Sequence, residues 1–303
     1  MDRRTTDNNV RPMRKRRRNR VNPFAMVILV ALVIIAAAGL ILYSVGYRYI
    51  TTDGVKFNGF VKDGLPVKGT VKYADDLSGK LEVDEESGIC TITYSNGDVY
   101  TGSLKGILRH GSGSISVNST DEVYTGDFVD DKLTGKATVT GPDGEKYEGD
   151  MVDGKKDGIG KLTLSDGSYY YGEFKDDMRN GCGEQHNADG SVYYGSFVGD
   201  KRQGTEKITF TLMDGSTFSG KPRMVFANGD EYVGDYFNDK RSGNGKYIWA
   251  SGAVYEGDFA GGMPNGIGTY TASAGSMPYT GEFANGQPVV TEVENAVPDT
   301  NER

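Results

Sequence analysis

The chain is poor in the residues on which metal centres, catalytic sites and disulfide scaffolds depend. Its 303 residues include two histidines, His110 and His186, which lie about three of the repeats described below apart. At roughly 30 Å by strand spacing, they cannot share a metal or a catalytic centre. No serine or cysteine has a histidine partner that suggests a triad, and no Gly-x-x-x-x-Gly-Lys-Ser/Thr phosphate loop occurs. We therefore expect no catalytic residues, no cofactor and no enzyme activity.

Cysteine is equally scarce, and Cys90 and Cys182 are the two present. This number excludes a disulfide-rich scaffold. The two lie 92 residues apart, which is four repeat periods. Four hairpins move the chain by about 40 Å, whereas a disulfide needs Cα atoms within about 7 Å. We expect both thiols to be free within one chain.

Apolar residues are few for the length, at 37%, whereas glycine (44 residues) and tyrosine (19 residues) are frequent. Glycine at roughly one residue in seven excludes a helical domain, because glycine destabilises helix interiors. Regularly spaced glycine indicates short strands and closely spaced turns. A thin sheet needs less apolar core than a thick globular domain, so the composition favours a sheet.

Charge is distributed unevenly along the chain. Residues 1–22 carry nine Lys/Arg and two acidic residues, a net charge of +7, and the remainder carries 25 basic and 40 acidic residues, a net charge of −15. The acidic body excludes nucleic acid as a partner and disfavours anionic lipid. The basic segment 1–22 is expected to be a disordered cytoplasmic tail beside the membrane.

One long apolar run follows the basic tail. Phe24 to Tyr43 contains no charge, and twenty residues in a helix rise about 30 Å, the thickness of a bilayer core. We expect a transmembrane helix within residues 23–47. A cleaved signal peptide is the alternative, but its apolar region would be about 7–15 residues long and would end in small residues. The cluster Ala36–Ala38 lies inside the run instead, which favours an uncleaved anchor.

The bias of positive charge sets the expected topology. Nine basic residues precede the apolar run, and Arg48 stands alone soon after it. The N-terminus is therefore expected in the cytoplasm, and the body outside, as a single-pass integral protein of the cell membrane.

The body consists of an internal repeat in which a tyrosine is followed two residues later by a glycine. Most steps between copies are 23 or 24 residues. A copy beginning at Phe218 gives steps of 25 and 14 residues, which suggests a loss of about nine residues there and an irregular hairpin. Weaker copies begin at Phe57 and Leu77. The expected structural positions are Tyr100, Gly102, Tyr124, Gly126, Tyr147, Gly149, Tyr170, Gly172, Tyr193, Gly195, Tyr232, Gly234, Tyr255, Gly257, Tyr279 and Gly281.

Each copy carries two turn signals, which predict one β-hairpin per copy. One is an Asn-Gly or Asp-Gly pair such as Asp143-Gly144, which is favoured where both turn residues need positive φ. The other is a longer polar loop such as residues 130–135. Between the turns, Tyr147, Gly149 and Met151 alternate with polar residues, so one face of each strand is expected to be buried.

The pattern resembles the MORN repeat (membrane occupation and recognition nexus), on the matches Tyr147, Gly149, Gly158, Gly160 and Asp166-Gly167 and their counterparts one period later. The resemblance implies an elongated, twisted antiparallel sheet of hairpins, and the roles of scaffold, protein-binding surface or membrane tether. The expected organisation is a basic tail (1–22), a transmembrane helix (23–47), a juxtamembrane segment with degenerate repeats (48–94), the MORN array (95–286), and a last strand or cap with a disordered tail (287–303).

Three sets of side chains are candidates for binding. The inward tyrosine stripe is expected to be sheet core rather than a ligand platform. Tyr169, Tyr171 and Tyr194 fall on the opposite, outer face and are candidate partner-binding residues. An outward acidic column is expected to be a solvated face rather than a calcium site, because single carboxylates one repeat apart do not supply six oxygens. Its members are Asp127, Asp150, Glu173, Asp235, Asp258 and Glu282.

The sequence thus predicts a membrane-anchored, non-catalytic scaffold that displays a MORN surface to a protein partner. A cell-wall or carbohydrate-binding role is the alternative, although such modules usually stack sugars on tryptophan and only Trp249 is present. An unrecognised hydrolase is a third reading, for which the sequence favours no particular acid.

Overall fold

The structure is a computed structural model that describes residues 23–289, so the predictions for the basic tail and for residues 290–303 fall outside the described residues. Its one helix within this range, α1, runs Pro23–Ser44, which confirms that the apolar run is helical. The segment Met26–Ser44 is long and apolar enough to cross a membrane, a property that a signal sequence shares. Contacts divide the chain into two compact units, one containing α1 and ending at Arg48, the other beginning at Tyr49.

The rest of the described chain is almost entirely β-structure. Its strands are β1 (Tyr47–Thr52), β2 (Val55–Lys62), β3 (Leu65–Lys72), β4 (Ser78–Val83), β5 (Cys90–Tyr94), β6 (Val99–Lys105), β7 (Leu108–Val117), β8 (Glu122–Val129), β9 (Lys132–Thr140), β10 (Lys146–Val152), β11 (Lys155–Thr163), β12 (Tyr169–Lys175), β13 (Met178–His186), β14 (Val192–Val198), β15 (Lys201–Arg202), β16 (Ile208–Thr211), β17 (Thr217–Gly220), β18 (Arg223–Val225), β19 (Glu231–Phe237), β20 (Lys240–Ile248), β21 (Val254–Ala260), β22 (Met263–Thr271), β23 (Tyr279–Ala284) and β24 (Gln287–Pro288).

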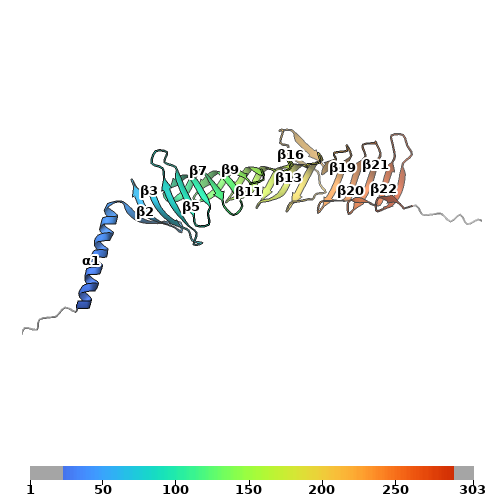
Figure 1. The fold of residues 1–303 in the computed structure, drawn as a ribbon. Coiled ribbons are helices and arrows are strands. Elements are labelled where there is room, and N and C mark those ends of the chain that lie inside the picture. The colour runs from blue at the N-terminus through green and yellow to red at the C-terminus, as the bar shows by residue number, and fades with distance from the viewer. Residues whose placement is uncertain (1–22, 290–303) are drawn as a thin grey trace, which may run out of the picture. The chain divides into compact units, whose positions relative to one another are not determined.

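Strand pairing follows the order of the sequence (Figure 1). From β2 to β14, each strand pairs antiparallel with the next, and β14 then pairs with β18, from which the ladder continues to β24. Within the described residues this is one 22-stranded sheet. The predicted all-β repeat array with one N-terminal helix is thereby confirmed, and strands β2–β5 of the juxtamembrane segment belong to the same sheet.

The sequence assigned the turn with two positive φ values to the Asp-Gly pairs, but the structure has it in the other, polar loop. Strands β8 and β9 are joined by Asp130 and Asp131 alone, and both have positive φ (46° and 72°), the geometry that matches strand twist. In the Asp-Gly turns, only the glycine has positive φ, as at Gly167 (83°). The amide of Ser168 donates to Asp166 Oδ1 at 2.9 Å, so the aspartate organises a longer turn through its side chain.

Five of the repeat tyrosines lie against a pair of glycines that face each other across two strands, namely Tyr100, Tyr147, Tyr170, Tyr232 and Tyr255. Gly149 is paired with Gly160, and a Cβ atom on Gly160 would collide with the ring of Tyr147. The ring is 1% exposed, and its hydroxyl donates to the carbonyl of Asp150 at 2.7 Å. Glycine is required here because only bare backbone lets the ring approach so closely.

Tyr124 shows what happens without the second glycine. Ala137 occupies that position opposite Gly126. The Tyr124 hydroxyl then donates to Glu122 Oε2 at 3.1 Å, rather than to the carbonyl three residues downstream as in the other buried copies. The ring is partly exposed. A single methyl group therefore displaces the repeat tyrosine.

The outward acidic column is partly solvated, as predicted, since Asp127, Glu173 and Glu282 are exposed, and it also has a structural role. Four of its carboxylates accept an amide of the second strand, at the point where the register slips by a bulge. Asp150 Oδ2, for example, accepts the amide of Ile159 at 3.1 Å. Asp235 is only 8% exposed. The four carboxylates that cap bulges in this way belong to Asp150, Glu173, Asp235 and Asp258.

The copy expected at Phe218 is wrong. Strands β16 and β17 form a separate two-stranded sheet outside the array. The step from Tyr193 to Tyr232 is 39 residues, 16 more than the regular 23, so this is an insertion rather than a loss. The segment Phe218-Ser-Gly220 resembles a repeat because it lies on a short strand and has an aromatic residue two positions before a glycine.

The two cysteines are free, as predicted. Cys90 is buried on β5, and burial raises the pKa of its thiol to about 12. Cys182 is partly buried on β13.

Candidate functional site

The face that carries the repeat tyrosines, called here the tyrosine face, holds a continuous ladder of aromatic rings. From Tyr170 onward, each repeat tyrosine meets the aromatic residue four positions later, edge to face. From Tyr147 to Tyr255, each also meets the corresponding aromatic residue of the next copy. Tyr170, for example, contacts Phe174 (5.2 Å between centroids) and Phe197 (5.0 Å). Such pairs each add about 0.5–1.5 kcal/mol beyond burial. In order, the rings are Tyr147, Phe174, Tyr170, Phe197, Tyr193, Tyr236, Tyr232, Phe259, Tyr255, Phe283 and Tyr279.

The ladder crosses the insertion without a break. Tyr193 meets Tyr236 at 5.1 Å, although the hairpin β16–β17 lies between them in sequence. Burial raises the pKa of Tyr236 to about 12 and also raises that of Tyr193. The tyrosine stripe is therefore core, as predicted, and its hydroxyls stay neutral at physiological pH.

A row of cations covers this ladder, and the sequence analysis missed it. Five copies carry a basic residue nine positions after the repeat tyrosine, and that residue lies over the rings. Arg179 lies 5.8 Å from the centroid of Tyr170 and 5.0 Å from that of Phe197, which is cation–π distance. The row consists of Arg109, Lys156, Arg179, Arg202 and Arg241.

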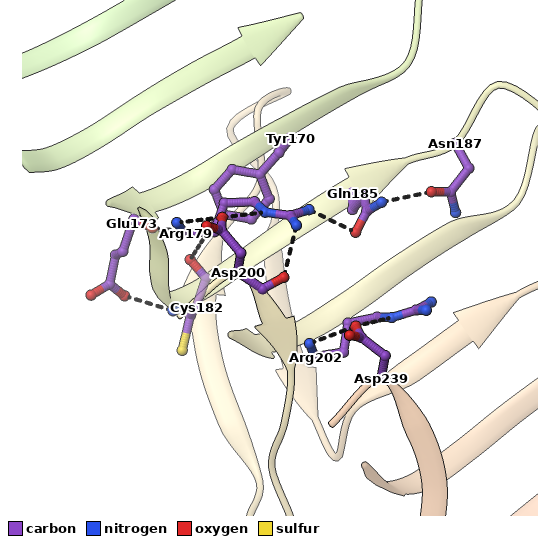
Figure 2. A network of polar contacts seen from close by, with 9 residues as sticks. All are labelled: Tyr170, Glu173, Arg179, Cys182, Gln185, Asn187, Asp200, Arg202 and Asp239. Carbon is purple, nitrogen blue, oxygen red and sulfur yellow. Dashed lines mark hydrogen bonds and ion pairs between the residues drawn. The ribbon is translucent and has the colours of Figure 1, made fainter. Parts of the chain in front are cut away.

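Four members of the row are clamped to the next copy by an aspartate, and Figure 2 shows two of them, Arg179 and Arg202. The amide and Nε of Arg179 both donate to Asp200 Oδ1, at 3.0 and 3.1 Å, and Nη2 donates to the Asp200 carbonyl at 2.7 Å. The amide of Asp200 returns a bond to the Arg179 carbonyl at 3.0 Å. Asp131, Asp177 and Asp239 make the corresponding bond to Arg109, Lys156 and Arg202.

These aspartates stand seven positions after the repeat tyrosine, in the two-residue turn. Their φ values are positive, for example 68° at Asp200. Aspartate is one of the few non-glycine residues that tolerate this conformation. The missed signal was present in the sequence, as a cation at a fixed offset in one copy and an aspartate at a fixed offset in the next.

Two copies lack the cation, and the tyrosine face is hollowed at both. Leu133 and Pro264 occupy the position of the cation, and the partner position in the next copy is Gly154 or Gly286. The first hollow, at Leu133, has a volume of about 260 Å³. The second, called here the Pro264 hollow, is about 470 Å³. The residues lining the Pro264 hollow are Trp249, Ser251, Ala253, Tyr255, Pro264, Tyr270, Phe283, Gly286, Gln287 and Pro288.

On the outer face, the three candidate tyrosines are partly buried and have different surroundings. Tyr169 stacks on His186 (4.2 Å between centroids), and Tyr194 stacks on Phe218 of the hairpin β16–β17 (5.3 Å). Tyr171 lines a shallow groove of about 400 Å³. The structure thus separates Tyr171, beside an open groove, from Tyr194, which packs on the inserted hairpin.

Glu184 fastens the inserted hairpin to the outer face. It is paired with Tyr171 on one side and Tyr194 on the other, and is 4% exposed. Its Oε1 accepts the amide of Met213 at 2.7 Å, and Oε2 lies 3.1 Å from His186 Nε2. A buried carboxylate needs such partners, because leaving it unpaired would cost several kcal/mol, on the order of 3–5.

The chain is similar to several solved structures of low sequence identity. One is the TCP domain of SAS-4 (dCPAP) of Drosophila melanogaster in complex with a proline-rich motif of Ana2 (17% identity, 57% of this chain and 88% of that chain covered, TM-score 0.29). Another is the TCP10 domain of Danio rerio CPAP in complex with a peptide of STIL (12% identity, 74% and 99% covered, TM-score 0.38). None of the curated proteins compared with the chain matches it.

The family comparison agrees with the repeats seen in the structure. The MORN repeat model matches six segments, and none of them includes the inserted hairpin. They are residues 124–146, 147–169, 170–192, 232–254, 255–277 and 279–290. The array therefore contains MORN repeats across residues 124–290.

Proposed function

We propose that this protein is a non-catalytic scaffold whose MORN array binds a protein partner. The observation that carries this proposal is the tyrosine face, on which one rigid ladder of rings is covered by cations at five copies and hollowed at two. Rigid sheet elements position a binding surface without ordering cost, and concave aromatic hollows are the usual places for an anchor residue.

The array is proposed to be held at the cell membrane by α1, as a single-pass, uncleaved anchor. Support comes from the length and composition of Met26–Ser44 and from the basic residues that precede it. In this proposal the N-terminus lies in the cytoplasm and the repeats lie outside. Protease added to intact cells should then digest the repeats, and digestion only after lysis would instead indicate a cytoplasmic body.

Tyr171 marks a second proposed contact, on the outer face. It lines an open groove, whereas Tyr194 is packed on Phe218 and Tyr169 on His186. A photo-crosslinking residue at Tyr171 should capture a partner in cells, and the same residue at Tyr194 should capture less because the hairpin covers that position. Equal capture at both, or at neither, would argue against the outer face as the contact.

Carbohydrate binding is the second candidate function, and one observation favours it. Trp249, the single tryptophan, lines the Pro264 hollow with Tyr270, at 5.8 Å between centroids. Aromatic rings of this kind also stack against sugars. Retention of the full-length protein on purified wall polymer, and its loss in Trp249→Ala, would support this function over protein binding.

A further inference from the structure

The two hollows lie where the repeat pattern omits a cation. In the copy that begins at Tyr232, Arg241 lies over the rings of Tyr232 (5.6 Å) and Phe259 (5.8 Å). In the following copy the equivalent rings are Tyr255 and Phe283, which meet at 4.9 Å in the same edge-to-face manner. Pro264 stands nine positions after Tyr255 and has no group to place over them. The Pro264 hollow is the space that an arginine fills one copy earlier.

We infer that the Pro264 hollow binds an arginine side chain of the partner protein. The inference rests on the proposed scaffold function and names the chemistry of one contact. The chain itself supplies the template, because four arginines and a lysine already occupy the corresponding place in other copies. A partner arginine would complete a row that the chain leaves incomplete.

The aromatic walls of the hollow suit a guanidinium. Trp249, Tyr255, Tyr270 and Phe283 surround it, and arginine stacks on aromatic faces better than other cations do. The surroundings of Arg241 show that aromatic rings can hold a guanidinium without an acidic partner. Arg241 forms no ion pair with residues 23–289, and its guanidinium lies near four rings, at distances from 5.0 Å (Tyr247) to 5.9 Å (Phe226).

A backbone acceptor is also in place. Gly286 donates its amide to the Pro264 carbonyl at 2.9 Å, which is the link that Asp200 makes to Arg179 at 3.0 Å. Gly286 therefore stands where Asp200 stands, and in that copy Arg179 Nη2 donates to the Asp200 carbonyl at 2.7 Å. The same bond from Arg109 to the Asp131 carbonyl is 2.6 Å. An incoming guanidinium would find the Gly286 carbonyl in the corresponding position.

Long-range charge favours the same ligand. No residue lining the hollow is charged, whereas the body of the chain beyond residue 22 carries a net charge of −15. Its field attracts a cationic segment and would repel an acidic one. The expected partner segment is therefore an extended, basic stretch with an arginine that inserts between Trp249 and Phe283.

Trp249 makes the test direct, because it is the only tryptophan of the chain and it lines the hollow. The full-length protein in detergent micelles is titrated with a capped glycine–serine pentapeptide that carries one central arginine. Matched peptides carry citrulline, which has the same shape without the charge, or leucine. We expect a saturable change in tryptophan fluorescence with the arginine peptide, and binding of the citrulline peptide weaker by about tenfold.

Variants of the chain locate the site. Pro264→Arg should place an arginine over Tyr255 and Phe283, as Arg241 lies over its rings, and should weaken peptide binding at least about tenfold. Pro264→Lys, which copies Lys156, is the second variant should the arginine variant fail to fold. Val198→Arg adds the same charge at an exposed position that lines neither hollow and is the matched control, and it should leave the titration unchanged.

Five results would overturn the inference. The first is no saturable binding of the arginine peptide, and the second is unchanged binding in Pro264→Arg. The others are equally tight binding of the citrulline or leucine peptide, saturation of the same signal by purified wall polymer, and tighter peptide binding in Arg303→Ala. The last result would identify the chain's own C-terminal segment as the occupant. A failed titration together with a partner captured at Tyr171 would overturn this inference alone. A bound peptide with no partner captured in cells would count against the scaffold function instead.

Discussion

Arg179 and Asp200 stand in successive repeats and are joined by four hydrogen bonds, three donated by the arginine and one by the aspartate amide. The arginine also lies over Tyr170 and Phe197, so one side chain ties the edge of the sheet to its aromatic core. Since the same pair of positions recurs in other copies, we regard this clamp as the unit that couples neighbouring repeats.

The clamp predicts an order of stability among Asp200 variants. Asp200→Gly loses the carboxylate bonds but keeps the left-handed backbone, as Gly154 and Gly262 do naturally, and should cost about 0.5–1.5 kcal/mol because the pair is partly exposed. Asp200→Ala should cost about 1–2 kcal/mol more, because alanine is strained at a φ of 68°. Thermal unfolding of the full-length protein measures both. Equal melting temperatures for the two variants would contradict a role for the positive φ.

Gly160 should not tolerate a methyl group. A Cβ there would collide with the Tyr147 ring, so Gly160→Ala must displace the ring as Ala137 displaces Tyr124. We expect a loss of about 1–3 kcal/mol, measured by denaturant unfolding. Gly141→Ala is the matched control, since its nearest neighbour would be the Glu145 Cβ at 3.5 Å and its φ is not positive. A loss as large at Gly141 would show that the ring contact is not the cause.

The inserted hairpin should open without the array unfolding. Glu184→Ala removes the acceptor of the Met213 amide, and Phe218→Ala removes the ring that stacks on Tyr194. Either change should speed amide exchange at residues 208–220, while strands β6–β8, which pair with neither the hairpin nor β13, stay protected. Lys207→Ala, an exposed residue just before β16, is the control and should leave exchange unchanged. Simultaneous loss of protection across the sheet would mean that the hairpin is part of the core.

Alkaline pH should unfold the array through its tyrosines. Burial raises the pKa of Tyr100 and of Tyr236 to about 12, from an ordinary value near 10. Because the neutral hydroxyl is the form favoured by folding, this stability is fully present below pH 10 and is lost as the pH rises toward 12. Tyrosinate absorbance and sheet content should therefore change together in this range. Titration of all 19 tyrosines near pH 10 in a sheet that stays folded would disprove the burial of these hydroxyls.

The sequence predicted the parts of the fold that depend on strand periodicity. The offset of two between Tyr147 and Gly149 places both on one face, and the period of 23 residues fixes one hairpin per copy. It failed at Phe218, because an inserted strand with the same Tyr-like spacing cannot be told from a repeat by local pattern. It also assigned positive φ to Asp143 rather than to Asp130, since aspartate serves both turn types and only the hydrogen bonds distinguish them.

Most of the candidate site could not be predicted from strand periodicity. Pro264 differs from its counterparts by lacking a cation, and this matters only once Arg241 is seen to lie over the rings. The alternation of side chains along the strands correctly predicted that Tyr171 and Tyr194 lie on one face. The ring that stacks on Tyr194, however, belongs to Phe218, 24 residues later in the chain. Contacts of this kind depend on where an insertion folds back, which spacing alone does not determine.

The pairing of each strand with its neighbour in sequence has a consequence for how such a chain can change. Because the sheet makes few contacts between distant copies, a copy can be gained, lost or interrupted without redesign of the others. The hairpin β16–β17 is an example, since the ring of Tyr193 meets that of Tyr236 as if the intervening residues were absent. The array is therefore modular. Its length and its inserted segments can vary, because the contacts between neighbouring copies are determined by residues of those two copies alone.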